Sequence, residues 1–205
     1  MISAMQHMND RIGRKQAQAD LCQPPGRRGR WRVPGLLLTL ALLGPGAPAL
    51  AQGMDVALVA AHADKDRVSK LGVVLGTTRA EPLWQGERWQ LRLRHEGELA
   101  AWRVPRARNL FEIGYSPVLR LERPLAAGGA FFAEASIGVR LVSHTRLSDT
   151  RAMSTAFQFA DMLGLGWRSA GRAELGLRLQ HISNAGIKRP NSGVNFVLLY
   201  YRQHF

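Results

Sequence analysis

The sequence predicts an all-β protein, an eight-stranded antiparallel transmembrane β-barrel that follows a cleaved signal peptide. The first observation is that apolar and polar residues alternate after residue 51 with a period of two, the period at which side chains change faces along a strand. The second is that several alternating segments are longer than the usual five or six residues and approach the roughly ten that a tilted strand needs to cross a membrane. The third is a secretory leader ahead of these segments.

The leader is expected to occupy residues 1–51, of which residues 1–26 form an N-terminal extension. Four arginines between residues 27 and 32 make a basic region, and an apolar run follows at residues 36–43. This run is too short to span a bilayer as a helix. The Ala-Leu-Ala sequence that ends at Ala51 has the small-x-small pattern of a signal-peptidase site. We therefore expect cleavage after Ala51 and a barrel formed by residues 52–205.

The composition narrows the chemistry of the exported part. Its 21 Lys and Arg residues exceed its 13 Asp and Glu residues, a balance that suits an anionic membrane surface or nucleic acid. The alternation favours the membrane, because it predicts these charges as pairs inside a barrel, and no nucleic-acid partner is expected. The single cysteine, Cys22, precedes the apolar run, which excludes a disulfide, a thiol nucleophile and a thiolate metal site. The histidines show no metal-binding spacing, so neither a metal nor a cofactor is expected.

Residues 171–184 show the alternation most clearly. Leu175, Leu177 and Leu179 share one face of this predicted strand, whereas Glu174 and Arg178 lie on the other. Similar patterns predict eight strands, near residues 54–63, 67–77, 86–99, 106–122, 130–143, 154–168, 171–184 and 193–205. The tryptophans expected to form an aromatic girdle at the membrane interfaces are Trp84, Trp89, Trp102 and Trp167.

Two architectures fit long alternating strands in a secreted protein. In a soluble sandwich the apolar face points inward, whereas in an outer-membrane barrel it faces lipid and the charged face fills the lumen. The charged face is rich in Arg and Glu, which can pair across a small barrel. The chain also ends on Phe205, which resembles the terminal strand of bacterial outer-membrane proteins. We therefore predict a barrel with both termini in the periplasm and the turn at residues 185–192 outside the cell.

A histidine and a serine interrupt the apolar face of this barrel. His181 and Ser183 have the parity of Leu179, so they are expected to face lipid at the outer end of their strand. Asn195 is expected on the same face of the neighbouring strand. A serine hydroxyl becomes a nucleophile when a base takes its proton, and histidine is the usual base. Most H-x-S sequences are only polar strand ends, but here the pair lies in a polar hairpin, "HISNAGIKRPNSG".

This hairpin resembles the PagL family of lipid A 3-O-deacylases over the pattern H-x-S-N-A-G-x-K-x-P-N-x-G, from His181 to Gly193. Strand order and spacing extend the resemblance more weakly over the exported chain. It implies an eight-stranded outer-membrane barrel that hydrolyses the ester at position 3 of lipid A without a cofactor. It also implies that His181 is the base, that Ser183 is the nucleophile and that Asn184 is needed for activity, in a critical or oxyanion-binding role.

The sequence departs from the family at the residue that orients the histidine. The family pattern has a glutamate fourteen residues after the histidine, where this chain has Asn195. An amide oxygen can accept the imidazole N–H, but it carries no charge to stabilise an imidazolium. Asp161, expected on the lipid face of the preceding strand, is a more distant alternative acid.

Other residues of the hairpin have weaker predicted roles. Asn184, Gly186 and Asn191 are candidate donors to an oxyanion. Lys188 and Arg189 are candidates for binding lipid A phosphates, with a solvated loop as the equal alternative.

The predicted function is that of an outer-membrane esterase whose active site faces the outer leaflet. Its expected partner is lipopolysaccharide, the substrate, and the sequence does not decide whether the protein forms a homodimer. It would release a 3-hydroxy fatty acid from lipid A. Two alternatives remain open: a non-catalytic small barrel for adhesion or membrane stabilisation, and another outer-membrane lipid hydrolase such as a phospholipase.

Overall fold

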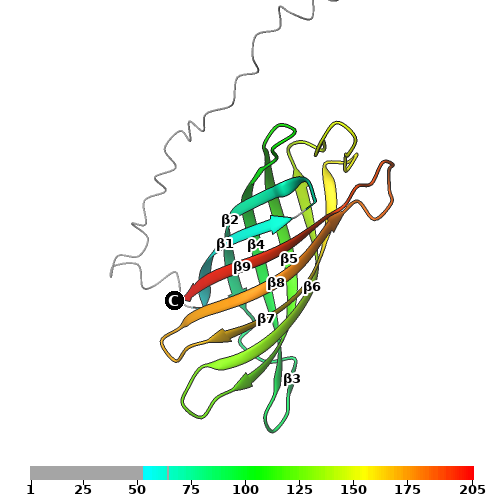
Figure 1. The fold of residues 1–205 in the computed structure, drawn as a ribbon. Helices are drawn as coiled ribbons and strands as arrows, with labels where there is room; N and C mark the ends of the chain where they lie inside the picture. Colours follow the sequence, from blue (N-terminus) through cyan, green and yellow to red (C-terminus); the bar gives the residue numbers. More distant parts are fainter. Residues whose placement is uncertain (1–52, 64) are drawn as a thin grey trace, which may run out of the picture. The chain divides into compact units, whose positions relative to one another are not determined.

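The computed structural model describes residues 53–63 and 65–205, so the expected leader lies outside the described residues. The described part is a closed antiparallel β-barrel (Figure 1). Its long strands are β1 (Met54–Ala63), β2 (Val68–Thr78), β4 (Gln90–Arg103), β5 (Leu110–Pro124), β6 (Ala130–Val142), β7 (Phe157–Arg168), β8 (Ala173–Ser183) and β9 (Val194–His204). The barrel closes where β9 pairs with β1. The predicted eight-stranded all-β fold is confirmed.

Two short elements lie between the long strands. A 3-10 turn, η2 (Lys65–Arg67), leads into β2, and β3 (Trp84–Gln85) pairs with the start of β4. Among the described residues, no helix is both long and apolar enough to cross a membrane.

The strand predicted at residues 86–99 begins four residues too early. Residues 86–89 form a tight turn instead, in which the Gly86 N–H donates to the Trp89 carbonyl at 2.8 Å. Trp89 at the end of this turn has the parity of Leu91 and Leu93 in β4, so the pattern alone could not separate the turn from the strand. The next strand was also predicted too early, since the loop around Pro105 delays β5 to Leu110.

The predicted assignment of faces is confirmed along the barrel. On β8, Leu175, Leu177 and Leu179 are about half exposed, whereas Glu174 and Arg178 are buried in the lumen. The outward apolar residues of the other strands include Leu58, Leu71, Leu75, Leu99, Phe111, Ile113, Leu119, Phe131, Ile137, Leu141, Leu163, Leu165, Val197 and Leu199. This outer wall is the apolar surface that a transmembrane barrel presents to lipid.

Ion pairs cross the lumen. Arg178 donates to Glu134 at 2.6 Å and to Glu96 at 2.8 Å. Arg120 bonds the same Glu134 at 2.9 Å and also Glu174 at 2.7 Å. Buried charges are costly unless they are paired and hydrogen-bonded, and these carboxylates are shared between guanidinium groups from different strands. The paired charges predicted for the interior are therefore present.

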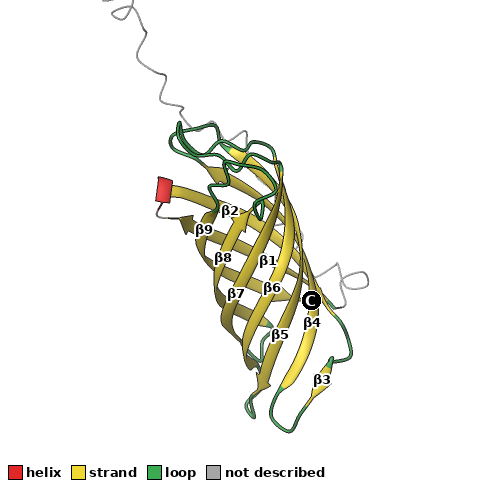
Figure 2. Cartoon of the chain, turned by 90° about the vertical axis from the view of Figure 1, so that its right-hand side faces the viewer, coloured by secondary structure: helices red, strands yellow, loops and turns green. Residues whose placement is uncertain are grey.

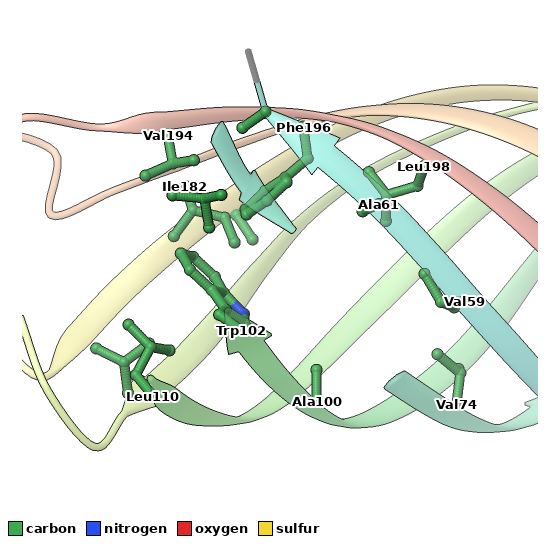
Figure 3. Packing of buried hydrophobic residues seen from close by; sticks show 14 of the residues in the cluster. Val59, Ala61, Val74, Ala100, Trp102, Leu110, Ile182, Val194, Phe196 and Leu198 are labelled. Carbon is green, nitrogen blue, oxygen red and sulfur yellow. The ribbon is translucent and has the colours of Figure 1, made fainter. Parts of the chain in front are cut away.

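One end of the lumen is apolar instead (Figure 3). Trp102 contacts Phe196 edge to face with a centroid distance of 4.7 Å, and its indole N–H donates to Glu112 at 2.5 Å. The interpretation of Trp102 as an interfacial girdle residue is therefore wrong. It has the parity of the luminal residues of β4, whereas Trp84, Trp89 and Trp167 are exposed.

Loops gather at this end of the barrel (Figure 2), and two of them pack against each other through the apolar cluster. Leu147 and Met153, from the loop between β6 and β7, are fully buried in the apolar cluster with Ile182 and Val194 of the β8–β9 hairpin. This packing joins the long loop to the hairpin. We call the end of the barrel that carries these two loops the hairpin rim.

Candidate active site

His181 lies in the middle of a polar row that crosses three strands on the outer wall. It is the direct partner of Asn195 on β9 and of Asp161 on β7. All three residues are exposed on the outward face. Directly opposite residues of antiparallel strands have Cα atoms roughly 4.5–5.5 Å apart, so both neighbours lie within side-chain reach of the imidazole. Asp161, expected as a more distant alternative, is thus an immediate neighbour in the register.

The imidazole is held from the β9 side. His181 Nδ1 lies 2.5 Å from Asn195 Oδ1. An amide oxygen only accepts hydrogen bonds, so Nδ1 carries the proton and Nε2 remains an acceptor in the neutral ring. The structure therefore brings together the two residues that the sequence places fourteen positions apart, and it leaves Nε2 with the basicity that a general base requires.

Ser183 lies two residues nearer the rim than His181, at the end of β8. Its partner on β7 is Phe159, whose ring packs edge to face on Phe157. Ser183 is partly exposed on the same outward face as His181. Its Oγ lies 3.4 Å from the Ala185 backbone N–H. A backbone donor therefore lies beside the hydroxyl, where a negative oxygen would develop during acyl transfer.

Asn184 points the other way, into the lumen, and is fully buried. Its amide nitrogen donates to the carbonyls of Met153 at 2.7 Å and Lys188 at 2.8 Å, which uses both of its hydrogens. Its Oδ1 accepts the Gly186 N–H at 2.9 Å, and its own N–H donates to Asn191 Oδ1 at 3.2 Å. Asn184 is thus hydrogen-bonded to Gly186 and Asn191, the other two residues that the sequence singled out as oxyanion donors. Its side chain shapes the turn after Ser183.

The turn itself has a left-handed backbone at two successive residues, Ala185 and Gly186, with φ angles of 51° and 83°. The Ile187 N–H donates back to the Asn184 carbonyl at 3.0 Å, which closes the turn. Glycine adopts such a φ without steric cost, whereas alanine does so only under constraint. The hydrogen bonds of Asn184 supply that constraint.

Lys188 and Arg189 lie on the exposed tip of the hairpin. Arg189 also lines a shallow hollow together with Gly186, Pro190 and Asn191. Among the described residues, no group of three His, Cys, Asp or Glu side chains is arranged to hold a metal ion.

Sequence reasoning did not identify Arg151 of the β6–β7 loop, which braces the hairpin. Its guanidinium donates to the carbonyls of Ser192 at 2.7 Å and Gly193 at 2.9 Å. The Ser192 N–H donates in turn to the Ala152 carbonyl at 3.0 Å, and Ser154 Oγ donates to the Pro190 carbonyl at 2.6 Å. These contacts join residues about forty positions apart, so no local pattern could have revealed them.

The order of strands, the outward polar row and the hairpin sequence all agree with one known family. The family model described as "Lipid A 3-O-deacylase (PagL)" matches residues 70–204. The chain belongs to the PagL family. The match includes β3 to β9 and all but the first two residues of β2, with the whole polar row, so family membership rests on the barrel as well as on the hairpin.

Two curated PagL proteins are similar to part of the chain. Lipid A deacylase PagL of Bordetella bronchiseptica is 45% identical over 78 residues, which is 38% of this chain and 43% of that protein. Lipid A deacylase PagL of Pseudomonas aeruginosa is 39% identical over 71 residues, which is 35% of this chain and 40% of that protein. The alignments thus span about two fifths of each relative.

A solved structure of the family is similar over a longer stretch. The crystal structure described as that of the outer membrane enzyme PagL superposes with a TM-score of 0.68 at 25% sequence identity. The superposition covers 74% of this chain and 99% of the crystallised chain. The PagL barrel is therefore present in full in this chain.

Proposed function

We propose that this PagL-family protein hydrolyses the ester at position 3 of lipid A and releases a 3-hydroxy fatty acid. The observation that carries the proposal is the row of Asp161, His181 and Asn195 on a largely apolar outer wall, with Ser183 two residues beyond His181 on the same face. Polar side chains that face lipid destabilise a barrel, so their retention there points to chemistry on a lipid. Family membership supplies the substrate class.

The reaction assigned to these residues is acyl transfer in two steps. Ser183 Oγ attacks the ester carbonyl carbon, and its proton passes to His181 Nε2, while Asn195 Oδ1 holds the Nδ1 proton. The sugar oxygen then leaves with the proton from Nε2, and an acyl-serine remains. Water attacks this acyl group with His181 again as base, which releases the fatty acid and restores Ser183.

The wall below the row suits the acyl chain of the substrate. Leu163, Leu179 and Val197 are partners across β7, β8 and β9 and form the next outward row beneath His181. Each is more than half exposed. A chain that enters from the membrane can lie along these residues with its ester level with Ser183. This arrangement favours a lipid substrate over a soluble ester.

The oxyanion of the first step would be bound by the backbone N–H of Ala185, in the turn after Ser183. This N–H lies 3.4 Å from Ser183 Oγ. In this proposal Asn184 acts by holding the turn, because its amide hydrogens are committed to Met153 and Lys188. Lys188 and Arg189 are assigned to the phosphates of lipid A, since cations at the headgroup level attract anionic lipid.

The proposed location is the bacterial outer membrane, with the hairpin rim at the outer leaflet after removal of residues 1–51. Labelling of single cysteines in intact cells tests the orientation. A membrane-impermeant maleimide should modify Lys188→Cys, on the hairpin, and should spare Gly171→Cys, in the loop at the opposite rim. The reverse pattern would place the site at the inner leaflet and contradict access to lipopolysaccharide.

An assay with purified protein in mixed micelles tests the substrate. Lipid A and a diacyl phospholipid would be supplied separately, and released fatty acids identified by mass spectrometry. We expect a 3-hydroxy fatty acid from lipid A and no release from the phospholipid. Release from the phospholipid alone would favour the phospholipase alternative. If the wild type released no fatty acid from either lipid and matched His181→Ala and Ser183→Ala in this respect, a non-catalytic barrel would be favoured.

A further inference from the structure

The imidazole of His181 occupies the space that a side chain at position 193 would fill. A Cβ atom built on Gly193 would lie 2.7 Å from His181 Cε1 and 3.1 Å from Nε2. Contacts between a Cβ and a carbon below 3.0 Å are essentially never found, so any residue other than glycine would displace the ring. The position of His181 Cε1 and Nε2 thus depends on the absence of a side chain at residue 193, just before β9.

Backbone conformation does not explain this glycine. The glycines with a left-handed φ among the described residues are Gly53, Gly128, Gly129 and Gly186, and Gly193 is not one of them. Its φ is open to other residues. A glycine in or beside a strand that has no conformational requirement can mark a place where another group approaches closely. Here that group is His181.

The register shows what the approach achieves. Ile182 pairs with Val194 in the last pair of the β8–β9 ladder, and Ser183 and Gly193 are the next residues toward the rim on the two sides. Directly opposite Cβ positions are about 4.5–5.5 Å apart on one face of a sheet. Because Nε2 lies 3.1 Å from the Cβ position of Gly193, the ring leans out of its own row into the row of Ser183. The vacancy at position 193 therefore brings the base toward the hydroxyl it must deprotonate.

The backbone of Gly193 is fixed independently of His181. Arg151 donates to the Gly193 carbonyl at 2.9 Å and to the Ser192 carbonyl at 2.7 Å. Strand β9 thus supplies an acceptor for Nδ1 at Asn195, and the residue just before β9 has no side chain to fill the space beside Nε2. The β6–β7 loop holds the backbone of that residue in place.

We propose that Gly193 is a positioning residue for the deacylation, which acts by letting the His181 imidazole lean from β8 toward the residue before β9 and so toward the level of Ser183, with Arg151 as its brace. This inference rests on the proposed function, because it assigns His181 and Ser183 their catalytic roles. It adds a specific requirement: a methyl group at position 193 must slow proton transfer from Ser183 while the barrel and the lipid-binding wall stay as they are.

The test measures the reactivity of Ser183 without the natural substrate. A long-chain alkyl fluorophosphonate forms a bond between its phosphorus and Ser183 Oγ, loses fluoride, and delivers the serine proton to His181 Nε2. Labelling rates would be compared for the wild type, Gly193→Ala, Gly97→Ala and Ser183→Ala. Gly97 is the matched control, because it lies exposed on the outer face of β4 and a Cβ there meets nothing within 4 Å.

We expect Gly193→Ala to label about 10–100-fold more slowly, since a misplacement of about 1 Å in a reacting group costs up to that much. Gly97→Ala should label at the wild-type rate and Ser183→Ala not at all. Deacylation of lipid A by Gly193→Ala should show the same loss in kcat with an unchanged KM. Wild-type labelling of Gly193→Ala, with Ser183→Ala silent, would overturn the inference and leave the proposed function standing. A wild type that is not labelled at Ser183 would overturn both.

A second variant covers the case in which Gly193→Ala folds poorly. In a His181→Ala background the added methyl group has room, so the double variant should form the barrel, as judged by its heat-dependent migration in gels. If Gly193 acts through the imidazole, Gly193→Ala should cause no further loss in that background. A further loss of the same factor would show that Gly193 acts independently of His181 and would overturn the inference.

Discussion

The inside and the outside of this barrel both carry polar residues where a membrane protein of its size could have used apolar ones. Inside, the charges satisfy one another: Arg202 alone contacts Asp55, Glu96 and Glu174. Outside, Asp161, His181 and Asn195 form a short row on a wall of leucines, joined by one bond between His181 and Asn195. The charges of the interior network are paired with one another without a ligand. The outer row, by contrast, has a role only when a lipid substrate is bound.

This difference separates residues that hold the fold from residues that act on a substrate. Buried ion pairs stabilise only while each partner is present, so loss of an interior charge should affect folding. The outer row lies on the outer surface near the hairpin rim, and loss of one of its residues should affect turnover rather than folding. The variants below test this separation, beginning with the largest expected effect.

Asn195 should affect turnover most among the orienting residues. Asn195→Ala removes the acceptor of the His181 Nδ1–H and should lower kcat by about 10²- to 10⁴-fold, since an incorrectly oriented base in a serine–histidine site costs up to about that much. Asn195→Glu should be at least as active as the wild type, because a carboxylate stabilises the imidazolium. Turnover by purified variants on lipid A measures both. Equal rates for the wild type and Asn195→Ala would show that Asn195 has no role.

Arg178 should affect stability and leave the site intact. Arg178→Met leaves Glu96 and Glu134 without one of their partners, and removal of one member of a buried ion pair costs about 3–5 kcal/mol. Arg168→Met is the matched control: Arg168 lies near the rim, is 29% exposed and pairs with Glu122 at 3.3 Å. It should cost about 1 kcal/mol or less. Urea unfolding in lipid bilayers measures both, and a reduced rate per folded molecule in Arg178→Met would argue against the separation.

Asp161 should have a smaller effect than Asn195. Its carboxylate lies on the strand next to His181 and can stabilise the imidazolium by charge. Two unit charges about 4 Å apart interact by about 1–4 kcal/mol in surroundings between water and a protein surface, and exposure keeps the effect near the lower limit. Asp161→Asn should therefore lower kcat by up to about tenfold. A loss as large as that of Asn195→Ala would make Asp161 the principal third residue.

Lys188 and Arg189 should produce the smallest change, confined to binding. Each cation near an anionic lipid surface contributes about 1 kcal/mol, so the double alanine variant should raise KM for lipid A several-fold to tens of fold with an unchanged kcat. The increase should shrink at high ionic strength. Arg88→Ala, in the turn at the opposite rim, is the control and should leave KM unchanged. Equal KM values for wild type and double variant would assign the two cations to a solvated loop.

Much of this arrangement could be predicted from the sequence, because the two-residue period of a strand determines which side chains face lipid and which face the lumen. The parity of Leu179, His181 and Ser183 predicts one outward row, and a hairpin with a short turn brings residues fourteen apart into register. The period does not mark where a strand begins, so the pattern predicts a strand at residues 86–89, where the structure has a turn. The hydrophobic character of Trp102 does not show which way it faces. Only its parity with the charged residues of β4 indicates that it points into the lumen.

The rest of the site depends on contacts between loops. Asn184 has the parity of Ile182 and so points inward, but its bonds to Met153 and Lys188 follow from the packing of two loops. The same is true of Arg151. The role of Gly193 is defined by a neighbouring ring, and a glycine carries no pattern that would reveal it.

The most direct test of the outer site is the mass spectrum of lipid A from cells that produce the wild type, Ser183→Ala or Ser69→Ala. Ser69 is the matched control, because it too lies near an exposed histidine on the outer wall: it is the cross-strand partner of His62, with its Oγ 3.4 Å from His62 Nδ1. We predict that the wild type and Ser69→Ala remove one 3-hydroxyacyl chain from position 3, whereas lipid A stays intact with Ser183→Ala, which is present in the membrane at the same level. Removal of that chain by Ser183→Ala at the wild-type level would contradict the account.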